Sequence, residues 1–274
     1  IRKMPKHKPQ RSYRTHLFLR GQADRLSSGV LRLLAILFWL VIWQLAALFV
    51  GKQFILPSPL ETLGCLGTLI CTGEFWVITA HSLLHIALGF FSALVGGILT
   101  SIASYRIRLI KTLISPLIAA IKSIPVASFV ILLLVWMHAS YLSVVVAHLI
   151  AFPIIYTNLL RGLESIDTKL LEMAYIFQIQ GCARIRSLYL SQVLPYFEAA
   201  ISLALGFCWK AGIAAEVIST PASSIGEELY SAKVFLDTPN LFAWTVVIVC
   251  ISALIEKGFS RLIRMIVRRI EEGA

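Results

Sequence analysis

Residues 161–195 read RGLESIDTKLLEMAYIFQIQGCARIRSLYLSQVLP, and they form a long polar stretch in a chain that is otherwise almost continuously apolar. The stretch carries four basic and three acidic residues, which are too many charges for a segment that crosses lipid. It is also too long for a tight turn, and long connections are commonly functional. Because its apolar residues recur at helical spacing, we interpret it as an ordered element that contacts a partner.

The composition around this stretch is that of a membrane protein. Of the 274 residues, 58% are hydrophobic and 14% are charged, and the mean hydropathy is +0.83. A soluble domain carries about a quarter charged residues. In lipid every backbone polar group must be paired within the chain, and these apolar runs are too long for barrel strands. The sequence therefore predicts an all-α polytopic membrane protein.

The apolar runs are long enough to predict six transmembrane helices. They lie at residues 31–50, 76–104, 109–137, 140–160, 196–218 and 241–263. Ser58 is expected to cap a short outer helix that begins at Pro59 and ends near Thr72. Residues 219–240 are predicted to form a polar outer loop.

The distribution of basic residues predicts the orientation. Six spans that start inside place both termini and the loops 105–111 and 161–195 in the cytoplasm. Counted through Arg32 at the first span and from Lys257 at the last, these regions hold 21 of the 25 Lys and Arg residues, whereas two lie in outer loops and two deeper within spans. This bias favours an arrangement with both termini inside. We interpret the basic tail, residues 1–29, as a segment held near anionic lipid headgroups rather than as a nucleic-acid-binding arm.

Small residues in the second span predict close helix packing. Gly89, Ala93 and Gly97 follow one another at intervals of four, as do Ser92, Gly96 and Thr100. Small residues at this spacing let two helix backbones approach each other in lipid. We therefore expect a helix–helix seam along this span.

The sequence carries no pattern that predicts catalysis or a bound cofactor. No phosphate-binding loop and no cluster with metal-ligand spacing is present. His81 and His85 are four apart, but no Glu follows the first, so we interpret them as packing residues. Cys65 and Cys71 lie in the predicted outer segment, where a disulfide is possible but free thiols are the favoured interpretation.

Charges inside the fifth predicted span are the most informative ones in the membrane. Lys210 and Glu216 are six residues apart and point about 120° away from each other on a helix. Ionisable groups in a span are rare and usually face the protein interior. Each of the two either pairs with a neighbouring helix or lines a translocation path. The same alternatives apply to Lys122, with the structural role preferred.

Within the polar stretch, the pattern predicts two short helices. Ser165 or Asp167 is expected to cap a helix that begins near Thr168. Its apolar stripe consists of Leu170, Leu171, Ala174 and Phe177. After a break at 178–181, a second helix is expected over about 183–192. Such a pair suits a groove on a soluble partner, and the alternative is an amphipathic helix that rests on lipid.

Residues 172–195 resemble the cytoplasmic motif of importer permeases of the ATP-binding cassette (ABC) class. The motif reads Glu-Ala-Ala, then a glycine six positions after the Glu, then a later hydrophobic-Leu-Pro. Glu172 and Ala174 match its start, and the later apolar residues and Pro195 match its end. The chain departs from the motif where Met173 replaces an alanine, Gln178 replaces the glycine and Ser191 replaces a proline. Gly181 follows three residues after the expected glycine.

Other segments resemble the nitrate/sulfonate/taurine-type subfamily of these permeases, and the resemblance extends over about 76–265. The matching segments are Ile124-Pro125-Val126-Ala127, Phe152-Pro153-Ile154 with Asn158 and Gly162, Trp209-Lys210, Ala214-Ala215-Glu216 and Ser224-Ile225-Gly226.

The resemblance implies a type I ABC importer permease in the bacterial plasma (inner) membrane. It implies a homodimer of permeases, two cytoplasmic ATP-binding subunits and an extracytoplasmic solute-binding protein, with membrane lipid as surroundings. It implies that the stretch contains a coupling helix, for which we select Glu172, Ala174, Gln178 and Gly181. Trp209, Lys210 and Glu216 are the candidates for the solute path.

These observations divide the chain into four parts. A basic tail covers 1–29, and the first span with its outer segment covers 30–75. The permease domain covers 76–265, with its coupling element at 161–195, and a cytoplasmic tail covers 266–274. The expected function is ATP-driven import of a small polar or anionic solute, with hydrolysis on a partner chain. The alternatives are a secondary transporter that works alone and a membrane scaffold that does not transport.

Overall fold

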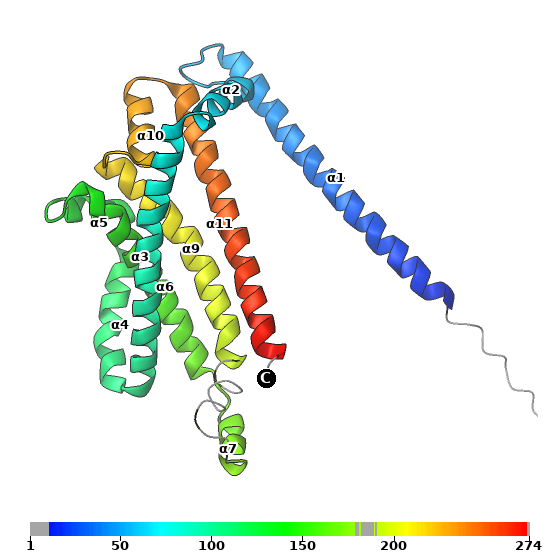
Figure 1. Ribbon diagram of the computed structural model, residues 1–274, viewed down its shortest axis with the longest axis vertical. Coiled ribbons are helices and arrows are strands. Elements are labelled where there is room, and N and C mark those ends of the chain that lie inside the picture. The colour runs from blue at the N-terminus through cyan, green and yellow to red at the C-terminus, as the bar shows by residue number, and fades with distance from the viewer. Residues whose placement is uncertain (1–10, 179–180, 182–188, 190, 273–274) are drawn as a thin grey trace, which may run out of the picture.

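The computed structural model describes residues 11–178, 181, 189 and 191–272, and within them every regular element is a helix (Figure 1). This agrees with the predicted all-α class. The helices are α1 (Arg11–Val50), α2 (Pro59–Ile70), α3 (Gly73–Arg106), α4 (Arg108–Ser123), α5 (Val126–Leu134), α6 (Ala139–Glu164), α7 (Thr168–Ile176), α9 (Ser191–Ser219), α10 (Ile225–Val234) and α11 (Thr238–Glu272).

Five of the described helices are long and apolar enough to cross a membrane, and the count becomes six if the bent pair α4–α5 is one span. Helices α3, α6 and α9 form the centre of the bundle, and their facing side chains make up most of the main core. Phe90, Ile155 and Trp209 are among its largest fully buried members. The bundle therefore places the predicted docking stretch between two central helices, α6 and α9.

The predicted seam on the second span is confirmed, and its partner is α6. A Cβ atom added to Gly89 would lie 2.3 Å from the carbonyl oxygen of Val144, and one added to Gly97 would lie 2.8 Å from the side chain of Ile155. Ala93, between them, is fully buried. On the neighbouring face, Ser92 hydrogen-bonds to His148 at 2.9 Å. Small residues thus let the backbones of α3 and α6 touch.

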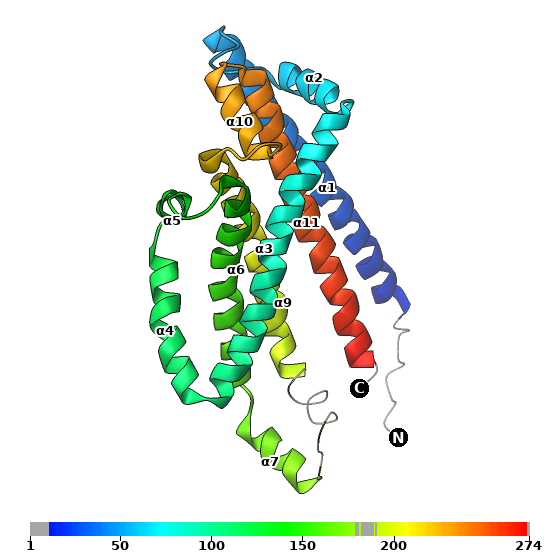
Figure 2. The ribbon, with the colours of Figure 1, turned by 60° about the vertical axis from the view of Figure 1, so that its left-hand side comes forward.

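The third predicted span, 109–137, is not one continuous helix. It is divided into α4 and α5, which meet at 101° (Figure 2). Pro125 disfavours helical geometry in the residue before it, and Ile124 accordingly has an extended backbone (φ −84°, ψ 129°). Pro116, in contrast, lies inside α4 without ending it. Helix α5 then turns onto α6 and α9, where Val130 is fully buried.

The outer end of the molecule holds the two short helices α2 and α10. Helix α2 begins as predicted: the Ser58 hydroxyl accepts from the Glu61 N–H at 3.2 Å, and the Glu61 carboxylate accepts from the Ser58 N–H at 2.8 Å. The segment 219–240, which was predicted to be a loop, contains helix α10, so that prediction is wrong in part. Cys65 and Cys71 are free thiols.

Helix α1 runs away from the bundle and is attached near its outer end (Figure 1). There the Trp43 indole N–H donates to the Pro57 carbonyl at 3.0 Å, and the Trp43 ring lies 5.7 Å from that of Phe242. In the apolar part of α1, within Gly29–Val50, only 6% of the residues are buried. The helix begins at Arg11, so part of the predicted basic tail is helical.

Candidate docking site and membrane-embedded charges

Helix α7 lies beyond the ends of the membrane-spanning helices, on the side predicted to be cytoplasmic (Figures 1 and 2). The chain enters it from α6, which continues to Glu164, four residues past the predicted end of the fourth span. It returns to the bundle in α9, which begins at Ser191. The polar stretch therefore supplies the ends of two membrane helices as well as a separate short helix between them.

The start of α7 has the cap that the sequence predicts. The Asp167 carboxylate accepts from the Lys169 N–H at 2.9 Å, and the Asp167 N–H donates to the side-chain oxygen of Gln192 at 3.3 Å. Of the two residues considered as the cap, Asp167 has this role. Ser165 instead ends α6, where its hydroxyl donates to the Gly162 carbonyl at 2.9 Å. The cap thus joins the beginning of α7 to the beginning of α9.

The end of α7 adopts the backbone geometry that favours glycine. Gln178, two residues after the last helical residue, has φ +55°, and Gly181 has φ +61°. Residues at this position after a helix commonly take the left-handed conformation, in which a side chain is strained. Gln178 stands where the resembling motif has its glycine. The structure thus gives a physical reason for a glycine at that position.

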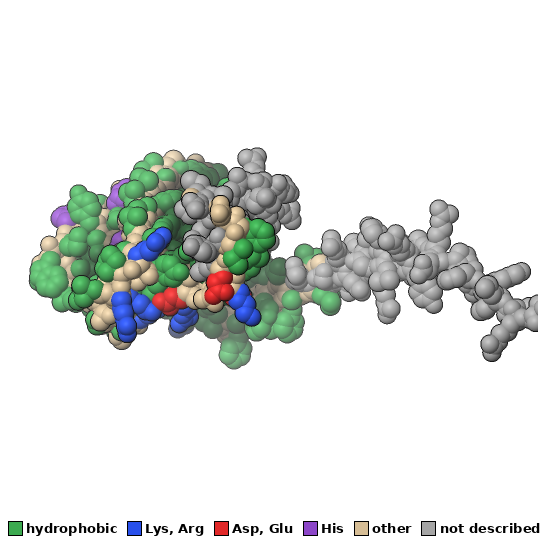
Figure 3. Space-filling view, turned by 90° about the horizontal axis from the view of Figure 1, so that it is seen from below, with side chains coloured by type: hydrophobic (Ala, Val, Ile, Leu, Met, Phe, Trp, Pro, Cys, Tyr) green, Lys and Arg blue, Asp and Glu red, His purple; other side chains and the backbone are tan. Residues whose placement is uncertain are grey.

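Apolar and acidic side chains are exposed together on α7. Met173 is 45% exposed, Ile176 is 75% exposed and Phe177 is 70% exposed. Glu172 is exposed beside them, whereas Ala174 is fully buried. Figure 3, which looks at this end of the molecule, shows hydrophobic, acidic and basic side chains next to one another. Exposed large apolar residues outside the membrane mark interaction sites.

The exposed surface differs from the predicted stripe. Phe177 is exposed, but Ala174, which was placed on the same stripe, is buried and Leu170 is half-buried. Sequence reasoning missed Met173 and Ile176, although the spacing of Met173, Ile176 and Phe177 at three and four residues was a readable signal. The predicted second helix, 183–192, lies almost entirely outside the described residues, and Ser191 belongs to α9.

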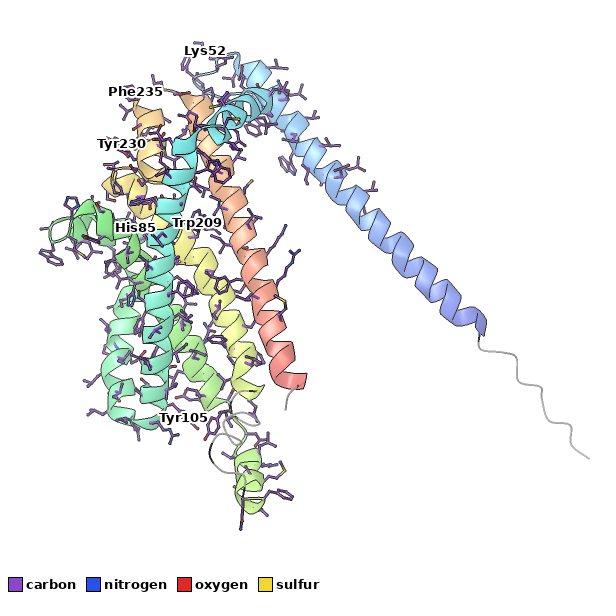
Figure 4. The ribbon with its side chains drawn as sticks, viewed as in Figure 1. Lys52, His85, Tyr105, Trp209, Tyr230 and Phe235 are labelled. Atoms are coloured by element: carbon purple, nitrogen blue, oxygen red, sulfur yellow. The ribbon has the colours of Figure 1, made fainter. Side chains whose placement is uncertain are left out.

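The three candidates for the solute path occupy different environments on α9. Lys210 is exposed on the helix, whereas Trp209 and Glu216 are each 1% exposed (Figure 4 labels Trp209). The Trp209 indole N–H donates to the Ile248 carbonyl at 3.2 Å, and its ring lines an apolar cavity between α3, α9 and α11. Lys122, on α4, donates to the Thr157 hydroxyl at 3.2 Å.

Glu216 joins three helices at the outer end of the bundle. Its carboxylate accepts from the Ser82 hydroxyl of α3 at 2.8 Å and from the Gly226 N–H of α10 at 3.4 Å. The Ser82 hydroxyl in turn accepts from the Ile225 N–H at 2.9 Å. The first turn of α10 thus points at a carboxylate, which the helix dipole favours. These contacts join Glu216 to α3 and α10.

Acidic side chains cluster on the outer face near α10. Burial and the nearby charges of Glu74 and Glu227 raise the pKa of Glu228 above its usual range. In α2, the backbone N–H of Ser58 lowers the pKa of Glu61. Among the described residues no group of three His, Cys, Asp or Glu side chains is arranged to hold a metal ion.

Comparison with known proteins finds one family over most of the chain. A sequence model described as "Binding-protein-dependent transport system inner membrane component" matches residues 86–272. The taurine transport system permease protein of Escherichia coli K12 is 28% identical over 87% of each chain. The riboflavin transport system permease protein of Chloroflexus aurantiacus is 27% identical over 84% of this chain and 86% of its own. The bicarbonate transport system permease protein of Synechococcus elongatus is 24% identical over 92% of this chain and 94% of its own.

Proposed function

Because this chain belongs to the family of binding-protein-dependent transport system inner membrane components, we propose that it couples ATP hydrolysis on partner subunits to import of a small polar or anionic solute. It is an ABC importer permease of the nitrate/sulfonate/taurine type, and a multi-pass protein of the plasma (inner) membrane. The proposal adds the coupling, the alternating access and the solute class. The chain itself is not expected to catalyse a reaction.

One observation carries the proposal: α7 projects past the bundle with exposed apolar residues and a carboxylate, between the two central helices. A short helix with such a surface fits a groove on a soluble partner. We assign that partner as the cytoplasmic ATP-binding subunit. Glu172 is the contact residue, Ala174 packs the helix, and Gln178 and Gly181 set the turn that follows it.

The assembly that we propose contains two copies of this chain, two ATP-binding subunits and an extracytoplasmic solute-binding protein. The relatives named above transport taurine, riboflavin or bicarbonate by their names, so this subfamily spans anionic and neutral solutes. ATP-driven closure of the partner subunits would act on α7 and open the spans to alternate sides of the membrane. Solute specificity is expected to lie largely with the binding protein.

Reversing the charge on α7 tests the docking assignment. Glu172→Arg places a cation where the partner is expected to meet a carboxylate, so ATP-binding subunits should no longer co-purify with the permease. Glu74→Arg is the matched control, because Glu74 is an exposed acid at the opposite end of the molecule. Normal co-purification with Glu172→Arg, with both variants inserted to the same level, would refute the assignment.

A second experiment tests Lys210 as a residue of the solute path. In proteoliposomes that contain the assembled importer, Lys210→Ala should lower ATP-dependent uptake of an anion such as bicarbonate by about tenfold, and Lys210→Arg should restore it. Assembly with the ATP-binding subunits should not change. A wild-type uptake profile for Lys210→Ala removes Lys210 from the path. Uptake that follows an ion gradient without ATP would contradict the coupling as a whole.

A further inference from the structure

A cavity of about 810 Å³ opens at the predicted cytoplasmic end of the bundle. The end of α3, the first three turns of α4 and the end of α6 form its walls. Tyr105, at the foot of α3 in Figure 4, is part of its lining. Figure 3 shows basic and acidic side chains near one another on the face at this end of the molecule. The function proposed above does not use this cavity.

The charge of the cavity wall is positive. Arg106, Arg108 and Lys111 line it together with a single acid, Glu164. Lys111 forms an ion pair with Glu164, which leaves two arginine charges uncompensated. In the part of the chain that the structure describes, neither Arg106 nor Arg108 takes part in an ion pair. A guanidinium binds phosphate oxygens through two parallel N–H groups, so a pair of them favours a phosphate group.

The start of α4 adds to this preference. Ile107 precedes the helix and has no side chain that can cap it, so the first turn lacks a side-chain partner for its N–H groups. Such a helix end attracts anions through its N–H groups and its dipole. Ile107, which precedes the helix, lies between Arg106 and Arg108 in the sequence. The positive end of the helix and the two guanidinium groups therefore act on the same part of the cavity.

The character of the wall changes with depth in the membrane. Along α4 the lining passes from Arg108 and Lys111 through Thr112 and Ser115 to Pro116 and Ala119. The distance from the first to the last of these positions is about 16 Å at the helical rise. This is about half of the ~30 Å hydrocarbon core, or one leaflet. The cavity wall is charged at its rim, carries hydroxyl groups in the middle and is apolar at its far end. A phospholipid has the same order, from its charged headgroup through its polar ester region to its apolar acyl chains.

We propose that this cavity binds an anionic phospholipid of the cytoplasmic leaflet, with its phosphate at Arg106 and Arg108. The acyl chains extend from the rim past Pro116 and Ala119. Basic pockets between membrane helices on the cytoplasmic side are known to suit anionic headgroups. A free phosphate ion would satisfy the arginines, but it would leave the apolar end of the cavity without a ligand. The inference does not depend on which solute is transported.

Lipid binding to the full-length chain tests the proposal. The purified permease is supplied with mixed micelles of phosphatidylglycerol and phosphatidylethanolamine, and bound lipids are counted by native mass spectrometry. The double variant Arg106→Gln/Arg108→Gln should bind phosphatidylglycerol about 30-fold more weakly. Arg261→Gln should bind it like the wild type, because Arg261 is an exposed arginine on α11 outside the cavity.

A second variant keeps the charges and fills the apolar end. Ala119→Trp should also weaken phosphatidylglycerol binding, while both arginines remain in place. Inorganic phosphate supplied without lipid is the other arm of the experiment. If phosphate binds with the same dependence on the arginines and displaces the lipid, the ligand is a free anion and the lipid assignment is overturned.

The remaining outcomes also decide the proposal. Equal binding of phosphatidylethanolamine, or an equal loss in Arg261→Gln, would overturn the selective site. A change in oligomeric mass in the double variant, with lipid occupancy unchanged, would make the cavity an interface between copies of the chain. The proposal is supported if the wild type binds phosphatidylglycerol selectively, both cavity variants lose this selectivity, and Arg261→Gln keeps it. Helix content by circular dichroism shows that each variant is folded.

Discussion

At the scale of single residues, Gln178 is the position where this chain and its family motif differ most informatively. Gln178 lies two residues after the end of α7 and has φ +55°, a conformation in which a side chain strains the backbone. Gln178 is exposed, so its side chain contributes little packing. The chain thus keeps the turn that a glycine would form, at a cost in backbone strain.

Replacing this residue by the family's glycine should stabilise the end of α7. Gln178→Gly is expected to lower the free energy of the turn by about 1 kcal/mol. Amide hydrogen exchange over 168–177, measured by mass spectrometry, should slow by about fivefold. Gly181→Ala is the reciprocal control, since φ is +61° and open space surrounds the added methyl group, and it should speed exchange. Equal exchange in all three proteins would show that these turns carry no strain.

At the scale of elements, the contact between α3 and α6 sets how closely the bundle packs. The added methyl group of Gly89→Ala would meet the backbone oxygen of Val144, which cannot rotate away as a side chain can. The helices must separate, and we expect a loss of about 2 to 3 kcal/mol. Thermal unfolding in detergent should show a lower midpoint.

Gly96 provides the matched control on the same helix. A Cβ atom there would lie 3.6 Å from the Phe152 ring, an ordinary contact distance. Gly96→Ala should therefore leave the unfolding midpoint almost unchanged. If both substitutions lower the midpoint equally, the loss does not come from the close approach of Gly89 to the Val144 backbone.

The sequence predicted the long helices well because hydrophobic length is a direct signal of a span. It did not predict the 101° bend at Pro125, because a proline within a span does not always end the helix, as Pro116 inside α4 shows. Helix α10 was missed although its cap was readable: Ser224 is followed three residues later by Glu227, and the Ser224 hydroxyl accepts from the Glu227 N–H at 3.1 Å.

The local features of the candidate site, such as its helix cap, could be predicted from the sequence, but the burial of its side chains could not. The Asp167 cap of α7 follows from a short-range rule. The burial of Trp209, Glu216 and Ala174 does not, because it depends on which neighbouring element covers each helix face. A charged residue in a span is expected to face the protein interior, but the sequence does not tell whether it contacts solute or a second helix.

At the scale of the whole molecule, the described chain consists of a packed bundle and one helix that stands apart. Helix α1 is anchored where Trp43 meets Pro57 and Phe242. Its remaining apolar surface is exposed to the surroundings. We expect the bundle to be stable without this anchor.

Trp43→Ala tests that independence. Loss of the indole should free the segment 51–57, so trypsin should cleave after the exposed Lys52 several-fold faster in detergent. The unfolding midpoint of the bundle should shift by no more than about 2 °C. Trp39→Ala is the control, because Trp39 is 67% exposed on the same helix. A large fall in the midpoint with Trp43→Ala alone would show that α1 supports the bundle.

The attachment of α7 to both α6 and α9 has a mechanical consequence. Among the described helices these two share the largest contact, and the Asp167–Gln192 hydrogen bond links the segment after α6 to the start of α9 next to α7. We expect a load applied to α7 to be divided between these two helices, which pack against each other. We expect this pair to tilt as a unit, so that a small displacement at one face of the membrane reaches the other face.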